Sequence, residues 1–158
     1  MFEPDKDGVV ARASASAMRR VFACLVLYGL GGLLIYVAVA APPSPFWLIF
    51  LIGLGVCVLL LAERMRRATE RVLELTTTEL RDDQGRVLAQ LADIKSVERG
   101  VFAMKPSNGF TLVLTKSSPR AWLPGLWWRA GRRVGVGGVV SSGPAKFMAE
   151  QIALRIAN

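Results

Sequence analysis

Two long apolar runs dominate the hydrophobic pattern of the chain. Residues 21–41 and residues 46–62 contain no charged side chain, and a short connection with three prolines separates them. At about 1.5 Å per residue, the first run is long enough to cross the apolar core of a bilayer, and the second lies at the short end of the spanning range. Because prolines stop helices on both sides of the connection, the pattern predicts a transmembrane helical hairpin over residues 21–63.

Two alternatives to a permanent hairpin remain open. Residues 38–40 (Ala-Val-Ala) match the cleavage site of a signal peptide, and the pair Arg19 and Arg20 fits either its basic segment or a twin-arginine export signal. The first apolar run is long for a signal peptide, however, and a second apolar run follows at once. Membrane insertion of both runs is therefore favoured.

Small residues interrupt both runs. Gly29 and Gly32 lie in the first, and Gly53 and Cys57 form a small-xxx-small pair in the second. Glycine would weaken a soluble helix, but in a bilayer it allows a neighbouring helix to approach closely. The sequence therefore predicts close helix approach at the glycines of the first run, Gly31 included, and takes Gly29, Gly32, Gly53 and Cys57 as the helix-packing positions.

Basic residues flank the hairpin and predict its orientation. Arg19 and Arg20 precede it, the intervening connection is uncharged, and three further arginines follow it: Arg64, Arg66 and Arg67. The positive-inside rule places both ends in the cytoplasm, as in a bacterial inner-membrane protein. Residues 1–20 are polar or small and are predicted to form a cytoplasmic tail, disordered or weakly helical.

From residue 71 onward, short β-rich segments recur between turns such as residues 82–85 (Asp-Asp-Gln-Gly). The last segment, residues 144–157, is an amphipathic helix. Its apolar stripe comprises Ala145, Met148, Ala149, Ile152 and Ile156. The whole pattern predicts an α+β protein: a transmembrane hairpin followed by a small antiparallel β domain over residues 71–158, capped by the C-terminal helix.

This order of elements resembles the bacterial pleckstrin-homology-like (PH-like) membrane proteins. The residues that carry the resemblance are 72–76, 94–97, 110–114 and the final helix. The resemblance implies a partly open β-barrel or sandwich that the helix closes. It also implies a docking surface rather than a site of chemistry.

Charge and composition limit the function further. The chain has a net charge of +8, and the 16 basic and 8 acidic residues from Arg64 onward account for that excess. A basic domain beside a bilayer points to anionic lipid headgroups, and no nucleic-acid-binding motif accompanies the charge. Histidine is absent, which removes the commonest general base and metal ligand. We therefore expect no enzymatic activity, no cofactor and no metal site.

One cluster combines aromatic and basic side chains: Trp122, Trp127, Trp128, Arg129, Arg132 and Arg133. Side chains alternate along a strand, so Trp127 and Trp128 cannot both face a core. The cluster either completes the core beneath a solvated basic face or forms a surface for a partner or a lipid.

These patterns predict a non-enzymatic accessory or assembly protein. It would dock a larger membrane protein complex through its hairpin and its basic PH-like domain. The alternative is a sensor or binder of anionic lipid headgroups at the cytoplasmic face.

Overall fold

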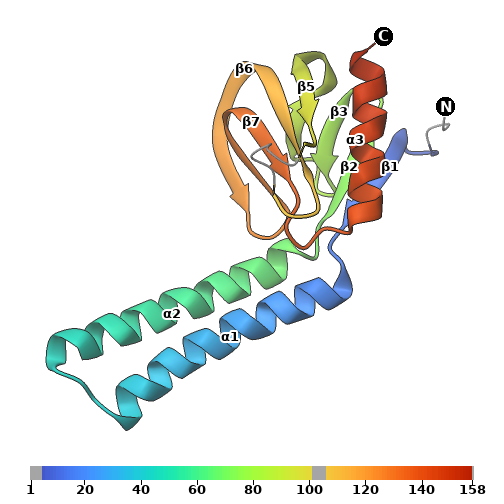
Figure 1. Ribbon diagram of the computed structural model, residues 1–158. Helices are drawn as coiled ribbons and strands as arrows, with labels where there is room; N and C mark the ends of the chain where they lie inside the picture. The colour runs from blue at the N-terminus through green and yellow to red at the C-terminus, as the bar shows by residue number, and fades with distance from the viewer. Residues whose placement is uncertain (1–4, 101–105, 158) are drawn as a thin grey trace. The chain divides into compact units, whose positions relative to one another are not determined.

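The computed structural model describes residues 5–100 and 106–157 and has an α+β fold (Figure 1). Its elements, in chain order, are β1 (Val9–Ser14), α1 (Ala17–Ala40), α2 (Pro45–Ala68), β2 (Val72–Thr76), β3 (Glu79–Asp82), β4 (Val87–Gln90), the 3-10 helix η1 (Leu91–Asp93), β5 (Ile94–Glu98), β6 (Phe110–Leu123), β7 (Trp127–Val136) and α3 (Ser142–Ile156). The chain divides into two compact units. The first, Ala17–Arg67, is the helical hairpin; the second, Met1–Ser16 with Ala68–Asn158, is the β domain.

The two predicted helices are present, and both are longer than the apolar runs. Each has 24 residues, so α1 begins before the charge-free stretch and α2 continues beyond it. The extension of α2 is stabilised locally, because Glu63 pairs with Arg66 three residues on and with Arg67 four residues on. Pro45 begins α2, where the absence of an N–H group costs nothing.

The prediction of an unstructured N-terminal tail is wrong for residues 9–14. They form β1, the edge strand of a four-stranded antiparallel sheet with the order β1-β2-β3-β4. Val9, Ala11 and Ala13 point into the core, whereas the residues between them are more exposed. β1 pairs with β2 up to Ser14 opposite Val72. The hairpin therefore does not precede the β domain; it is inserted between two neighbouring strands of it. Residues 1–4 of the predicted tail lie outside the described residues.

Two turns shape the first sheet. The segment 72–80 reads as one strand in the sequence, but Thr76 ends β2, because its Oγ1 accepts hydrogen bonds from the backbone N–H groups of Thr78 and Glu79. The predicted turn at residues 82–85 is confirmed. Asp82 Oδ1 accepts N–H groups from Gln84 at 3.0 Å and Arg86 at 2.9 Å, and Gly85 adopts a φ of +79°.

The second sheet has the order β5-β6-β7, also antiparallel. A turn is expected at residues 116–120, but the structure continues β6 through them. The β6–β7 register shifts on both sides of Ser118, and Pro119 falls in that irregularity, where a missing N–H group breaks no regular ladder. The chain turns only after Leu123, at Gly125, which has a φ of +83°.

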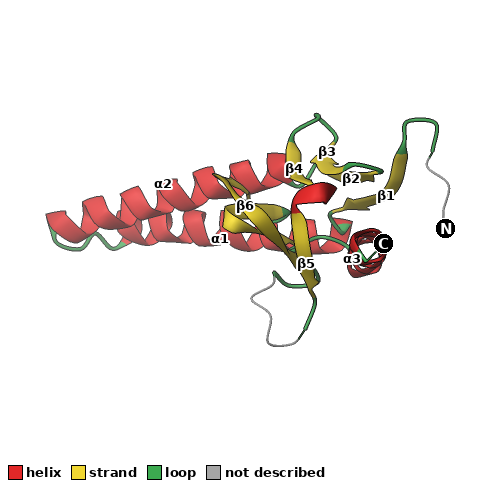
Figure 2. Cartoon of the chain, turned by 90° about the horizontal axis from the view of Figure 1, so that it is seen from above, coloured by secondary structure: helices red, strands yellow, loops and turns green. Residues whose placement is uncertain are grey.

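Helix α3 covers the core from one side. Four members of its predicted stripe are buried, namely Ala145, Met148, Ala149 and Ile152, and the fifth, Ile156, is partly buried against the core. α3 packs against β1 of the first sheet and β5 of the second (Figure 2). Among the described residues the two sheets pair separately, so they do not close into a barrel.

Candidate functional site

The hairpin is apolar, and few of its residues are buried. Both helices are long and apolar enough to cross a membrane, yet only 17% of the most apolar window of α1 and 11% of that of α2 are buried. Side chains as large as Phe22, Phe46 and Ile49 are about 70% exposed. A core helix of a soluble protein would be mostly buried. The exposed apolar surface therefore suggests association with a membrane.

The helices of the hairpin meet at Gly31 and Gly55. A Cβ atom added to Gly31 would lie 2.8 Å from the side chain of Leu59, and one added to Gly55 would lie 2.7 Å from that of Ile35. Each added Cβ would also lie 3.1 Å from the carbonyl oxygen of the other glycine. This close backbone approach is the packing that small residues permit. Sequence reasoning named Gly31 among the glycines of the first run but missed Gly55. Both glycines lie about ten residues from the connection, hence at matching depth in an antiparallel pair.

The predicted packing residues lie on other faces. A Cβ at Gly29, Gly32 or Gly53 would meet no atom within 4 Å, and Cys57 is exposed. The structure thus does not use these four residues to join α1 to α2. Their role in packing against another helix stays a prediction, and it requires a partner outside this hairpin.

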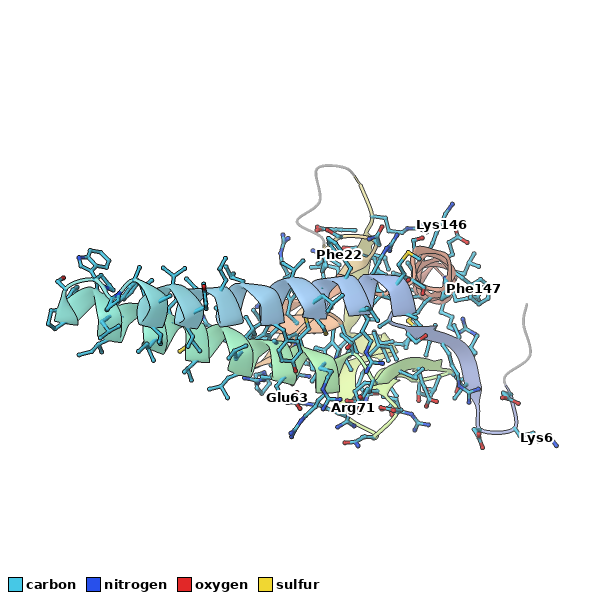
Figure 3. The ribbon with its side chains drawn as sticks, turned by 90° about the horizontal axis from the view of Figure 1, so that it is seen from below. Lys6, Phe22, Glu63, Arg71, Lys146 and Phe147 are labelled. Atoms are coloured by element: carbon cyan, nitrogen blue, oxygen red, sulfur yellow. The ribbon has the colours of Figure 1, made fainter. Side chains whose placement is uncertain are left out.

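A polar cluster links the two helices near the charged end of the hairpin. The Tyr28 hydroxyl on α1 donates to Glu63 Oε2 on α2 at 2.7 Å. Arg66 donates to both oxygens of that carboxylate, at 3.0 and 2.7 Å, and Arg67 Nε donates to Oε1 at 2.8 Å. Glu63, labelled on α2 in Figure 3, is the single acidic residue among residues 17–67. Two of the predicted juxtamembrane arginines are therefore oriented by a carboxylate.

The other three predicted juxtamembrane arginines differ in exposure. Arg19 and Arg64 are exposed, whereas Arg20 is half-buried and its Nη2 contacts the carbonyl oxygen of Arg66 at 3.5 Å. Arg20 and Arg66 thus lie at the same end of the hairpin, on different helices.

The tryptophans of the predicted cluster divide between core and surface. Trp127 is 1% exposed and part of the core, whereas Trp122 is 49% exposed. Trp128, opposite Trp122 in the β6–β7 ladder, is half-buried, and its indole covers Gly135, where a Cβ would overlap the ring. The alternation expected of Trp127 and Trp128 is confirmed. Arg86 also packs over the Trp127 ring, with its guanidinium carbon 5.4 Å from the ring centroid.

Arg129 belongs to the framework of the β domain. Its Nε donates to the Pro119 carbonyl at 2.8 Å, and its Nη1 donates to the Val87 and Leu88 carbonyls at 3.0 and 3.3 Å. Burial, and to a smaller degree the charge of Arg86, lowers the pKa of Arg129. The side chain thus ties β7 of one sheet to β4 of the other.

The remaining members of the cluster define its accessible part. Arg132 is exposed, and Arg133 is exposed with a contact to Glu98 at 3.4 Å. Trp122, Trp128, Arg132 and Arg133 are thus the members that solvent reaches, and we refer to them together as the Trp–Arg surface.

The β domain also contains an open cavity of about 420 Å³ beside the start of α3. Its polar lining comes from Arg99, Asn108, Ser142 and Lys146, and its apolar lining includes Phe110. Arg99 also pairs with Glu150 at 3.7 Å. Two cationic side chains and one nearby carboxylate leave the cavity with a positive balance.

Comparison of the chain with protein-family models, curated proteins and solved structures found no match.

Proposed function

We propose that the protein is a non-enzymatic integral membrane protein that docks a larger membrane protein complex as an accessory or assembly factor. The observation that supports this best is the hairpin, whose two 24-residue helices expose most of their apolar surface. The seam between them uses Gly31 and Gly55, which leaves the notches at Gly32 and Gly53 open to an outside helix. A hairpin that served only as a tether would not need those notches.

The β domain is the second docking element in this proposal, and we infer a PH-like fold for it. A four-stranded sheet, a three-stranded sheet and a closing C-terminal helix, in that chain order, support this assignment. The fold itself identifies no ligand. The Trp–Arg surface supplies exposed aromatic and guanidinium groups, which are frequent at the centres of protein interfaces.

The pairing of β1 with β2 supports the proposed topology. Ser14 lies opposite Val72, so the two strands that flank the hairpin are neighbours. If the hairpin crosses a membrane, both of its ends must lie on the same side. The arginines at both ends support a cytoplasmic location for that side, in a bacterial inner membrane with both termini cytoplasmic.

Two measurements test the proposal. Alkaline carbonate should leave the full chain in the membrane pellet; its release would contradict integral insertion. A photo-crosslinking amino acid at position 32 or 53 should then give discrete protein adducts in native membranes. The matched control is the same amino acid at position 39, where Val39 is 69% exposed but borders no glycine notch. Equal adducts at all three positions would reduce the hairpin to a tether.

The cavity beside α3 favours a second candidate function, binding of anionic lipid headgroups. Arg99 and Lys146 supply its cationic groups, and each cation near an anionic surface contributes about 1 kcal/mol. Short-chain phosphatidylglycerol should stabilise the full chain thermally, and Arg99→Gln with Lys146→Gln should abolish that stabilisation. Arg132→Gln, which removes an exposed charge outside the cavity, is the control. Equal loss in the control would show that charge alone, and not the cavity, attracts the lipid.

A further inference from the structure

A groove of about 350 Å³ lies at the charged end of the hairpin, within the size range of small-molecule sites. Its lining forms one stripe along α1 with a single contribution from α2: Arg20, Val21, Cys24, Leu25 and Tyr28 on α1, and Arg66 on α2. Positions 20, 21, 24, 25 and 28 recur at helical spacing, so they share one face of α1. The groove is thus a continuous feature of the hairpin.

The two ends of the groove differ in chemistry. Val21 and Leu25 are 56% and 64% exposed and form an apolar wall above the buried Cys24. Arg20 and Arg66 both line the groove, and Arg20 Nη2 donates to the backbone carbonyl of Arg66 at 3.5 Å. Arg20 immediately precedes the charge-free stretch of α1, which is the level where headgroups and acyl chains of a bilayer meet. A ligand of this groove is therefore anionic at one end and apolar at the other.

Glu63 orients this charged end without neutralising it. Arg66 directs Nε and Nη2 to the carboxylate, which Tyr28 and Arg67 also contact. The hairpin contains five arginines and this one glutamate, a net charge of +4, and all six residues lie near its charged end. The local field therefore favours an anion over a zwitterion.

We propose that the groove binds one anionic phospholipid, with its phosphate at Arg20 and Arg66 and part of an acyl chain along Val21 and Leu25. Arginine binds phosphate with directed, charge-assisted hydrogen bonds. The apolar wall covers part of the acyl chain and so removes that apolar surface from water. A soluble phosphate would use the arginines but not the wall. This proposal rests on the proposed membrane insertion and adds a defined lipid site to it.

The experiment uses the full chain in bilayer nanodiscs with a phosphatidylglycerol probe that carries a photoreactive diazirine on one acyl chain. Peptide mass spectrometry then locates the label. We expect labelling to concentrate on residues 21–28, and a phosphatidylcholine probe with the same chain to label this segment less. At about fivefold for each charge-assisted hydrogen bond to the phosphate, Arg20→Gln with Arg66→Gln should reduce the labelling roughly 25-fold.

Two further variants keep the test decisive. Arg19→Gln with Arg64→Gln removes the same charge from exposed positions outside the groove. Because exposed charges are screened by salt, this pair should reduce the labelling less than fivefold. Cys24→Phe keeps every charge but fills the groove. It should reduce labelling roughly tenfold, the effect of about two lost methylene contacts.

Several results would overturn the proposal. These are uniform labelling of α1 and α2, equal loss in the two arginine pairs, equal labelling by phosphatidylcholine, or displacement of the probe by millimolar glycerol phosphate. If any of these results is found while the chain stays in the membrane pellet after alkaline carbonate, only the lipid site in the groove is refuted. Release of the chain by carbonate refutes the membrane insertion, and the groove site with it.

Discussion

Arg129 offers the sharpest test of how the β domain is held together. The substitution Arg129→Met keeps a flexible apolar stem and removes the guanidinium. Three hydrogen bonds disappear with it, two to carbonyl groups of Val87 and Leu88 in β4 and one to Pro119 in β6. The variant therefore separates a structural role of Arg129 from the role in a binding surface that the sequence pattern suggests.

The expected loss of stability follows from those bonds. A hydrogen bond from a charged donor contributes about 1.5–3 kcal/mol when buried. Arg129 is only half-buried, so water can replace part of each bond. We therefore assign about 1 kcal/mol to each and expect a loss of roughly 2–3 kcal/mol. For a domain of this size, that corresponds to a decrease in Tm of roughly 10–20 °C.

The assay is thermal unfolding of the full chain in mild detergent, followed by near-ultraviolet circular dichroism of the tryptophans. Arg132→Met is the matched control, because it removes the same group from an exposed position of the same strand. Its free energy of unfolding should change by no more than about 0.5 kcal/mol. Equal Tm values for the two variants would refute the structural role of the Arg129 hydrogen bonds. Weakened docking by Arg129→Met at unchanged Tm would show instead that Arg129 belongs to the binding surface.

Three other predictions follow from the packing. Gly109→Ala should prevent stable folding of the β domain, measured as loss of the cooperative unfolding transition, because the added Cβ would overlap the carbonyl of Val136. Gly31→Ile should separate α1 from α2, measured as a lower Tm of the hairpin in detergent. Gly32→Ile adds the same side chain in open space and should leave the Tm unchanged. Equal effects of the two variants would contradict helix packing at Gly31. A chain that joins β1 through a short glycine-serine linker to residues 68–158 should unfold at a higher temperature than residues 68–158 alone. Only the linked chain pairs both edges of β2, with β1 on one side and β3 on the other. Equal Tm values would contradict the role of β1 in stabilising the sheet.

Local patterns in the sequence were sufficient for several elements. The charge-free runs specify two helices because every side chain in them favours an apolar environment, and the prolines between them separate α1 from α2. The apolar residues of α3 recur at helical spacing, so the sequence alone predicts which residues of this helix are buried. The Asp82–Gly85 turn and the opposite facing of Trp127 and Trp128 are also local, since they depend on side-chain hydrogen bonding and on strand alternation.

The tertiary structure decided what depends on partners distant in the chain. The apolar residues of β1 are only valine and alanine, which is a weak signal for a strand. It becomes a strand because β2, which follows the hairpin in the chain, pairs with it. Gly29 and Gly32, which do not meet α2, are chemically identical to Gly31, which does; the rotation of α1 against α2 distinguishes them. Arg129 and Arg132 are the same residue type in one strand, but only Arg129 is half-buried and donates to carbonyl groups of β4 and β6. Periodicity determines which face of an element is apolar, whereas register and packing between distant segments determine what covers that face.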